Sequence, residues 1–191
     1  MVFFEGEVTE RLYINGLRKI LRRHPIQIEP GSKNGEPLGL VRSAIKRADE
    51  MRAGDAYDAI WCLFDVETPP HGSLSSALSL AAKNGIKCAV SNPCFELWLI
   101  LHLLNHNREV TTSGMVKLAD KEIASYKEKG FEFDALKEGI GQAISRAADL
   151  DSRFAPDAPI QGKNPSTSMW KFMTTVEEFA GIKFDSLLPR E

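Results

Sequence analysis

The feature that most restricts the fold of this chain is the uninterrupted apolar run Ala59–Phe64, which ends at an acid, Asp65. A strand that is apolar on both sides must be covered on both faces, as strands are in parallel sheets flanked by helices. Shorter apolar segments, Val2–Phe4, Ile26–Ile28 and Ile86–Val90, alternate with amphipathic stretches. This alternation predicts β/α units around a four-stranded, mainly parallel sheet flanked by helices.

Helices are expected between these strands and through most of the second half of the chain. The spacing of apolar residues predicts them over 9–23, 38–51, 74–84, 95–104, 113–129, 134–154 and 166–179. A length of 191 residues fits one domain. We therefore expect a single domain over 1–191, with an α/β core over 1–105 and a mostly helical C-terminal extension over 106–191.

The charge balance excludes a chain coated with basic residues. There are 24 Lys and Arg against 26 Asp and Glu, giving a net charge of -2. A nucleic acid would therefore have to be bound through a local patch or a bound cation. The sequence leaves the oligomeric state open.

The apolar segments indicate a protein without membrane contact. The longest, Leu97–Leu104, is interrupted by His102 and is far too short to span a bilayer. No basic stretch followed by a long apolar segment begins the chain, so no secretion signal is expected. Cys62, Cys88 and Cys94 lie in apolar surroundings without metal-ligand spacing, which is typical of reduced thiols in a cytoplasmic protein.

Acidic residues follow two of the predicted strands. Glu5 follows the first strand, with Glu10 just beyond, and Asp65 and Glu67 follow the third. Because parallel strands bring their carboxyl ends to one edge, these acids are expected to gather there, where they repel by roughly 1 to 4 kcal/mol per pair. A divalent cation relieves this repulsion, and oxygen ligands favour Mg²⁺, Mn²⁺ or Ca²⁺. The alternative is a set of solvated acids at strand ends.

Several other residues are candidates for contact with a substrate phosphate. Gly6 permits a sharp turn and a close approach to the backbone, unless it is an ordinary turn glycine. The helix predicted after Asn92 offers free N–H groups, although Asn92 could equally cap that helix. His102 is either an active-site hydrogen-bonding group or a polar core residue. The full set comprises Gly6, Lys33, Ser91, Asn92, Glu96, His102, Asn164 and Ser166.

Four short stretches carry a resemblance to known families. The opening Glu5-Gly6-Glu7-Val8-Thr9-Glu10 resembles the "EGxxTE" start of Toprim domains in the overcoming-lysogenization-defect nucleases. Phe64-Asp65-Val66-Glu67 resembles the second Toprim acidic motif, which is usually Asp-x-Asp. Residues 91–102 (SNPCFELWLILH) are similar to the signature of the RloB-like family, and residues 164–167 (NPST) to its C-terminal motif.

The resemblance implies a Toprim/Rossmann-like fold and Mg²⁺-dependent phosphodiester chemistry. It also implies a role in anti-phage defence, often beside an AAA-type ATPase. Carried over residue by residue, Glu5 is the general acid or base, Asp65 and Glu67 are metal ligands, and Glu10 is an additional metal-binding acid. A Mg²⁺- or Mn²⁺-dependent nuclease acting on DNA or RNA is therefore expected.

Two other functions stay open at this stage. The first is a Toprim-like module that binds a partner ATPase or a nucleotide without cutting anything. It is favoured by Glu67, which is one methylene longer than the usual Asp, and by the short first strand. The second is a hydrolase of small nucleotides.

Overall fold

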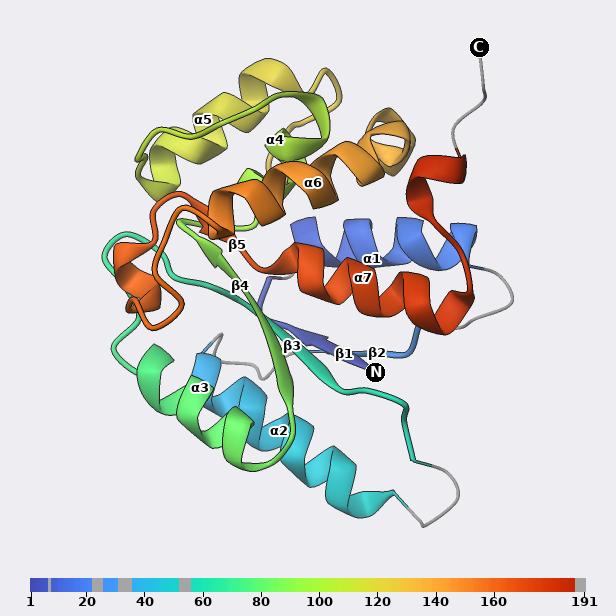
Figure 1. Ribbon diagram of the computed structural model, residues 1–191, viewed down its shortest axis with the longest axis vertical. Helices are drawn as coiled ribbons and strands as arrows, with labels where there is room; N and C mark the ends of the chain where they lie inside the picture. The colour runs from blue at the N-terminus through green and yellow to red at the C-terminus, as the bar shows by residue number, and fades with distance from the viewer. Residues whose placement is uncertain (7, 22–25, 31–35, 52–55, 188–191) are drawn as a thin grey trace.

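A five-stranded sheet runs through the middle of the molecule (Figure 1). The computed structural model describes residues 1–6, 8–21, 26–30, 36–51 and 56–187. The strand order is β2–β1–β3–β4–β5. The strands are β1 (Val2–Phe4), β2 (Ile28–Pro30), β3 (Trp61–Asp65), β4 (Lys87–Asn92) and β5 (Ser166–Thr167).

The first four strands are parallel to their neighbours, as the β/α alternation predicts. The fifth strand is antiparallel to β4 and was not predicted, because residues 166–167 were expected to begin a helix. Here Ser91 pairs with Thr167, and their hydroxyl oxygens lie 2.9 Å apart. A two-residue strand is too short to carry an alternation signal. The sheet is therefore mixed and has five strands, so the prediction of a four-stranded, mainly parallel sheet is only partly confirmed.

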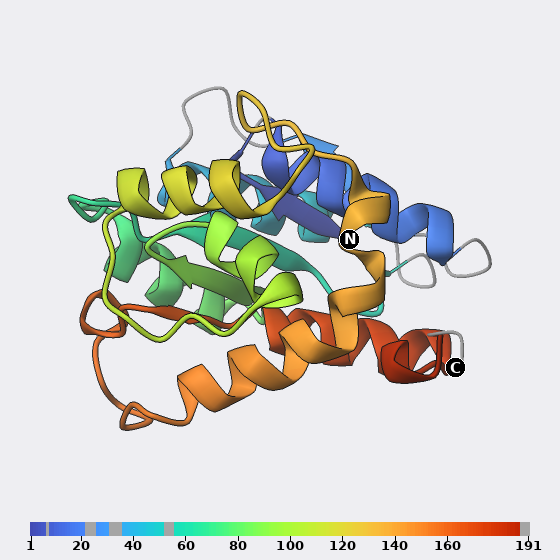
Figure 2. The same cartoon turned by 90° about the horizontal axis from the view of Figure 1, so that it is seen from above.

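Helices cover both faces of the sheet. They are α1 (Thr9–Ile20), α2 (Pro37–Glu50), α3 (Leu74–Lys83), α4 (Glu96–Leu103), α5 (Thr112–Glu122), α6 (Ile140–Asp151) and α7 (Met169–Ala180). Short 3-10 turns occur at η1 (Phe133–Ala135), η2 (Lys137–Gly139), η3 (Ile160–Gly162) and η4 (Phe184–Leu187). Helices α2 and α3 lie on one face, and α1 and α7 lie on the other, beneath α4, α5 and α6 (Figures 1 and 2). None of the described helices combines the length and the apolar character needed to cross a membrane.

The alternation of side chains along β1 and β3 divides the core in two. Phe3, Cys62 and Phe64 pack with α2 and α3, whereas Phe4 and Leu63 belong to the larger cluster on the opposite side. The larger cluster also contains Phe172 and other residues of α7. The C-terminal part of the chain therefore contributes a strand to the sheet and a helix to the layer that covers it.

Two predicted helices are shorter than expected. The helix predicted over 113–129 ends at Glu122, and the chain then forms a tight turn in which Lys127 and Gly130 exchange two backbone hydrogen bonds of 2.8 Å. The segment predicted as helical from residue 134 begins with η1 and η2 before α6 starts at Ile140. Tertiary contacts decide both endings, because nothing in the local apolar spacing interrupts these helices.

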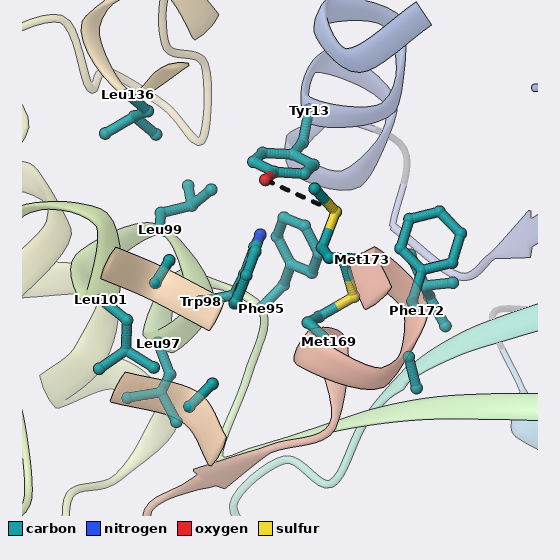
Figure 3. Close-up of a cluster of buried hydrophobic side chains, with 14 of the residues drawn as sticks. Tyr13, Phe95, Leu97, Trp98, Leu99, Leu101, Leu136, Met169, Phe172 and Met173 are labelled. Atoms are coloured by element: carbon teal, nitrogen blue, oxygen red, sulfur yellow. Dashed lines mark hydrogen bonds between the residues drawn. The ribbon is translucent and has the colours of Figure 1, made fainter. Parts of the chain in front are cut away.

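His102 packs against the rings of Tyr13 and Trp98, two residues of the larger cluster that Figure 3 shows. Nδ1 of His102 donates to the backbone oxygen of Trp98 at 2.8 Å, so Nε2 is left to accept from the hydroxyl of Tyr13 at 3.1 Å. Burial lowers the pKa of His102 to about 4, which keeps the ring neutral. His102 is therefore a polar core residue, in agreement with the second of its two predicted roles and not with a substrate contact.

Candidate functional site

A cleft of about 390 Å³ lies at the carboxyl edge of β1 and β3. Five carboxylates line it, from Glu5, Glu10, Asp65, Glu67 and Glu96. They come from the ends of β1 and β3 and the starts of α1 and α4. All four acids predicted to form a metal site therefore share one cleft. Glu96, which was predicted to bind substrate, lies with them.

Glu5 follows the last residue of β1 and points one carboxylate oxygen at a histidine. Its Oε1 lies 3.4 Å from Nε2 of His71, in the loop after β3. Its Oε2 is buried without a hydrogen-bond partner. Burial raises the pKa of Glu5 to about 7, and the charges of Glu10, Glu67 and Glu36 add to the rise. A carboxyl group with this pKa can both give and take a proton near neutral pH.

Gly6 makes room for Glu10. A Cβ atom on Gly6 would overlap the Glu10 carboxylate, so any larger residue at this position requires that carboxylate to shift. Burial raises the pKa of Glu10 to about 7, and the charge of Glu96 adds to the rise. The backbone N–H groups of Glu10 and Gly6 and the charge of Lys129 oppose it. Gly6 thus permits a close approach, as predicted, but the group that approaches is a side chain of the site itself.

Asp65 ends β3 in the middle of the acidic group. Burial raises its pKa well above the usual value, and the charges of Glu10, Glu96 and Glu67 raise it further. The backbone N–H of Phe95, which favours the charged form, opposes the rise. The pKa of Asp65 therefore responds to acids from three other segments of the chain.

Glu67 is held in an unusual backbone conformation. Its φ of 69° lies in the left-handed region, which costs a residue with a side chain roughly 1 to 2 kcal/mol. Its backbone N–H donates to the carbonyl of Pro93 at 2.8 Å, and the N–H of Val66 donates to that of Ser91 at 2.9 Å. These bonds to the end of β4 hold the strained turn in place.

Glu96 is the first residue of α4 and is almost fully buried. The hydroxyl of Tyr126 donates to its Oε1 at 2.8 Å. The carboxylate of Glu96 lies at the positive end of the α4 helix dipole. Burial and the adjacent Glu96 raise the pKa of Tyr126, so that its hydroxyl remains a donor.

Four other predicted substrate-binding residues do not line the cleft. Asn92 does not cap α4, because its Nδ2 donates to the carbonyl of Ile160 at 2.8 Å. Asn164 accepts from and donates to the backbone of Val110, at 3.2 and 2.9 Å. Ser91 contacts Thr167, and Ser166 is buried in β5. The structure therefore makes these residues part of the joint between β4, β5 and the neighbouring loops.

Some predictions concern residues outside the described part of the chain, and some site residues were not predicted. Lys33 and Glu7 fall outside the described residues. His71, Cys94 and Lys129 are at or near the cleft but were not predicted. His71 follows Glu67 closely in sequence, and this proximity was the one feature of the sequence that could have indicated a position near the cleft. The turn that brings Lys129 to the cleft has no such signal.

The donor set of the cleft fits a hard divalent cation. Within the described ranges, no three His, Cys, Asp or Glu side chains already stand at metal-ligand spacing. The donors are nevertheless carboxylate oxygens that repel one another, and Oε2 of Glu5 is buried without a partner. Mg²⁺ and Mn²⁺ prefer such ligands. Among the described residues, no lysine or arginine forms an ion pair with Glu5 or Asp65 that would replace the cation.

The fold and the cleft define an α/β protein with an acidic site at the carboxyl edge of its sheet. A family model described as RloB-like protein matches residues 1–176. The chain therefore belongs to the RloB-like protein family, which confirms the resemblance of residues 91–102 and 164–167. Comparisons with curated proteins and with solved structures found no match.

Proposed function

We propose that this protein is a Mg²⁺- or Mn²⁺-dependent phosphodiesterase of the Toprim type that acts as a nuclease. The observation that carries the proposal is that Glu5, Glu10, Asp65 and Glu67 line one cleft, although they follow two different strands. Membership of the RloB-like family supports it. Action in the cytoplasm in anti-phage defence, with an AAA-type ATPase as partner, belongs to the same proposal.

The proposed mechanism divides the acids by environment. Asp65, Glu67 and Glu10 would hold the metal, which when bound would neutralise phosphate charge and polarise the phosphoryl oxygens. Glu5 moves the proton of the attacking water or the leaving oxygen, because its pKa near 7 permits both directions at neutral pH. His71, 3.4 Å from Oε1, keeps that carboxylate turned toward the loop after β3. The proposal also places Glu5 among the metal ligands, because it lines the same cleft.

A cleavage assay tests the proposal directly. Labelled DNA and RNA are incubated with the protein in Mg²⁺ or Mn²⁺, and Glu5→Gln and Asp65→Asn are compared with wild type. Glu178→Gln, on the exposed surface of α7, is the matched control. We expect the cleavage rates of Glu5→Gln and Asp65→Asn to fall at least about a hundredfold. Losses of this size are typical when a general acid–base group or a metal ligand is removed. Cutting that persists unchanged in both would refute the proposal.

A second candidate function is a module that binds a partner or nucleotide without hydrolysis. The observation that favours it is that no three described acids already stand at metal-ligand spacing. Calorimetric titration with Mg²⁺ and Mn²⁺ separates the two functions. Uptake of metal that is lost in Asp65→Asn supports the enzyme. Tight binding of a partner ATPase without metal uptake supports the module.

A further inference from the structure

We propose that Lys129 binds a backbone phosphate of the nucleic-acid substrate at the cleft, beside the phosphate that the metal holds. This inference rests on the proposed function, which supplies the substrate class. It adds a substrate-binding residue that lies on a turn between α5 and η1, outside all the stretches that carry the family resemblance.

The charges around the cleft create a need for such a residue. Five carboxylates line the cleft, and Lys129 is the only lysine or arginine among the described residues that line it. A polyanion that approaches these acids is repelled unless positive charge meets it. A bound divalent cation neutralises only part of that charge. Lys129 provides a further positive charge at the cleft.

The amine of Lys129 is available for a ligand. The residue is exposed, and within the described ranges its side chain forms no ion pair or hydrogen bond. Its charge nevertheless acts on Glu10, whose pKa it lowers. The amine therefore lies near the acids but forms an ion pair with none of those described.

The backbone around Lys129 is held in a conformation that residues with side chains rarely adopt. Glu128 has a φ of 50° and Lys129 a φ of 66°, both in the left-handed region. Tight turns of this kind usually place Asn and Gly at these two positions. Glu67 is the third non-glycine residue with positive φ in the described part of the chain, and it also lines the cleft. Strained backbone of this kind gathers at functional sites.

The turn is attached to the elements that carry the acids. The hydroxyl of Thr9, the residue before Glu10, donates to the carbonyl of Lys129 at 3.2 Å. On the other side, the hydroxyl of Tyr126 donates to Glu96. The segment after α5 lies beside the start of α1 (Figure 2). The position of Lys129 relative to the metal-binding acids is therefore fixed by two hydrogen bonds.

A simpler role for Lys129 is to offset the charge of Glu10. The two roles predict different measurements. A counter-charge affects metal affinity and the titration of Glu10, and leaves the salt dependence of nucleic-acid binding unchanged. A phosphate-binding lysine adds one released counterion to that salt dependence.

The test measures binding of fluorescently labelled single- and double-stranded oligonucleotides by anisotropy, over a range of monovalent salt. Ca²⁺ replaces Mg²⁺ at a fixed concentration, so that binding is followed apart from hydrolysis. The variants are Lys129→Gln, Lys129→Arg and the control Lys127→Gln, which removes an exposed lysine of the same turn that does not line the cleft. Thermal unfolding checks that each variant is folded.

We expect Lys129→Gln to weaken binding roughly five- to eightfold near 0.1 M salt and to reduce the salt slope by about 1. Lys129→Arg keeps most of the affinity, and Lys127→Gln keeps all of it. Equal losses in Lys129→Gln and Lys127→Gln, or no loss in either, overturn the inference. A change in metal affinity alone for Lys129→Gln also overturns it.

The outcome is separable from that of the cleavage assay. If the wild type binds nucleic acid through Lys129 but never cuts it, the phosphodiesterase proposal fails and the inference about Lys129 stands. If cutting requires Glu5 and Asp65 but Lys129→Gln leaves both binding and KM unchanged, the inference fails and the proposed function stands.

Discussion

Oε1 of Glu5 and Nε2 of His71 lie 3.4 Å apart, which joins the end of β1 to the loop that follows β3. The contact gives the half-buried Glu5 carboxylate one polar neighbour, while its other oxygen has no hydrogen-bond partner. An imidazole N–H or an imidazolium at this distance favours the ionised form of the carboxyl group. From this contact we expect His71 to act against the burial and the neighbouring acids that raise the pKa of Glu5.

Removal of this contact is expected to shift the pH dependence of the reaction. In His71→Ala the pKa of Glu5 rises further, so the acidic limb of the pH–rate profile moves to higher pH. The rate at pH 7 falls by roughly two- to tenfold, since one pKa unit is a factor of ten in the ionised fraction. His106→Ala, in an exposed segment away from the cleft, is the control. If the acidic limb of the pH–rate profile is unchanged in His71→Ala, His71 does not influence the titration of Glu5 and the prediction is wrong.

Gly6→Ala is expected to abolish metal uptake without unfolding the protein. The added methyl group displaces the Glu10 carboxylate, and misplacement of a catalytic group by about 1 Å can cost a hundredfold in rate. Gly72→Ala is the matched control, because a Cβ there meets nothing within 4 Å. Calorimetry with Mn²⁺ and a cleavage assay measure the effect. Equal behaviour of the two variants would show that Glu10 simply moves aside.

Stability of the metal-free protein is expected to fall as pH rises from about 5 to 8. Glu5 and Glu10 have pKa values of about 7 in the folded protein, against an ordinary value of 4.5, so the folded state binds more protons than the unfolded chain across this interval. The two acids contribute fully to the stability of the fold at pH values below their ordinary pKa of 4.5. This contribution is lost as the pH rises through their pKa of about 7 in the folded protein. Thermal unfolding across this range measures the slope.

Two changes should remove this loss of stability. Mg²⁺ or Mn²⁺ stabilises the protein more at pH 8 than at pH 5, because the cation binds the ionised acids. Glu10→Gln stabilises the metal-free protein at pH 8 by about 1 to 3 kcal/mol, and Glu138→Gln, on the exposed surface, does not. A melting temperature that rises between pH 5 and 8 without metal would contradict the proposed environment of both acids.

Tyr13→Phe is expected to destabilise the fold while leaving the turnover of the folded protein unchanged. The substitution leaves Nε2 of the buried His102 without its hydrogen-bond donor, which costs about 1 to 3 kcal/mol. Tyr57→Phe, which loses a hydrogen bond at the surface, costs less. Denaturant unfolding and the cleavage rate of the folded protein measure the two effects. If the Tyr13→Phe variant is stably folded but has lost its turnover, His102 acts in the active site and its assignment to the core is wrong.

The acids of the cleft could be predicted because their signal is local. Asp65 and Glu67 directly follow an apolar strand, Glu5 follows another, and parallel topology then brings both ends to one edge. The larger of the two hydrophobic clusters and the neutral state of His102 depend on packing among residues far apart in sequence. The cluster is only implied by apolar spacing, and the position of His102 in the core was one of two open alternatives.

The residues that complete the cleft could not be predicted in the same way. The turn that carries Lys129 depends on the Tyr126–Glu96 bond and on the pairing of Lys127 with Gly130. Neither is encoded in the helical spacing of the preceding segment. Likewise, β5 exists because its two residues complete the edge of β4, so its conformation is decided by a partner rather than by its own sequence.

The antiparallel pairing of β5 with β4 also has a consequence for biosynthesis. Among the residues that the structure describes, the outer edge of β4 pairs with Ser166 and Thr167 alone, and Cys94 and Glu96 reach the cleft just beyond that strand. A ribosome must therefore reach residue 167 before this wall of the cleft has its final support. During elongation Glu5 and Glu10 are synthesised long before β5, so the site of the nascent polypeptide stays incomplete until β5 has been made.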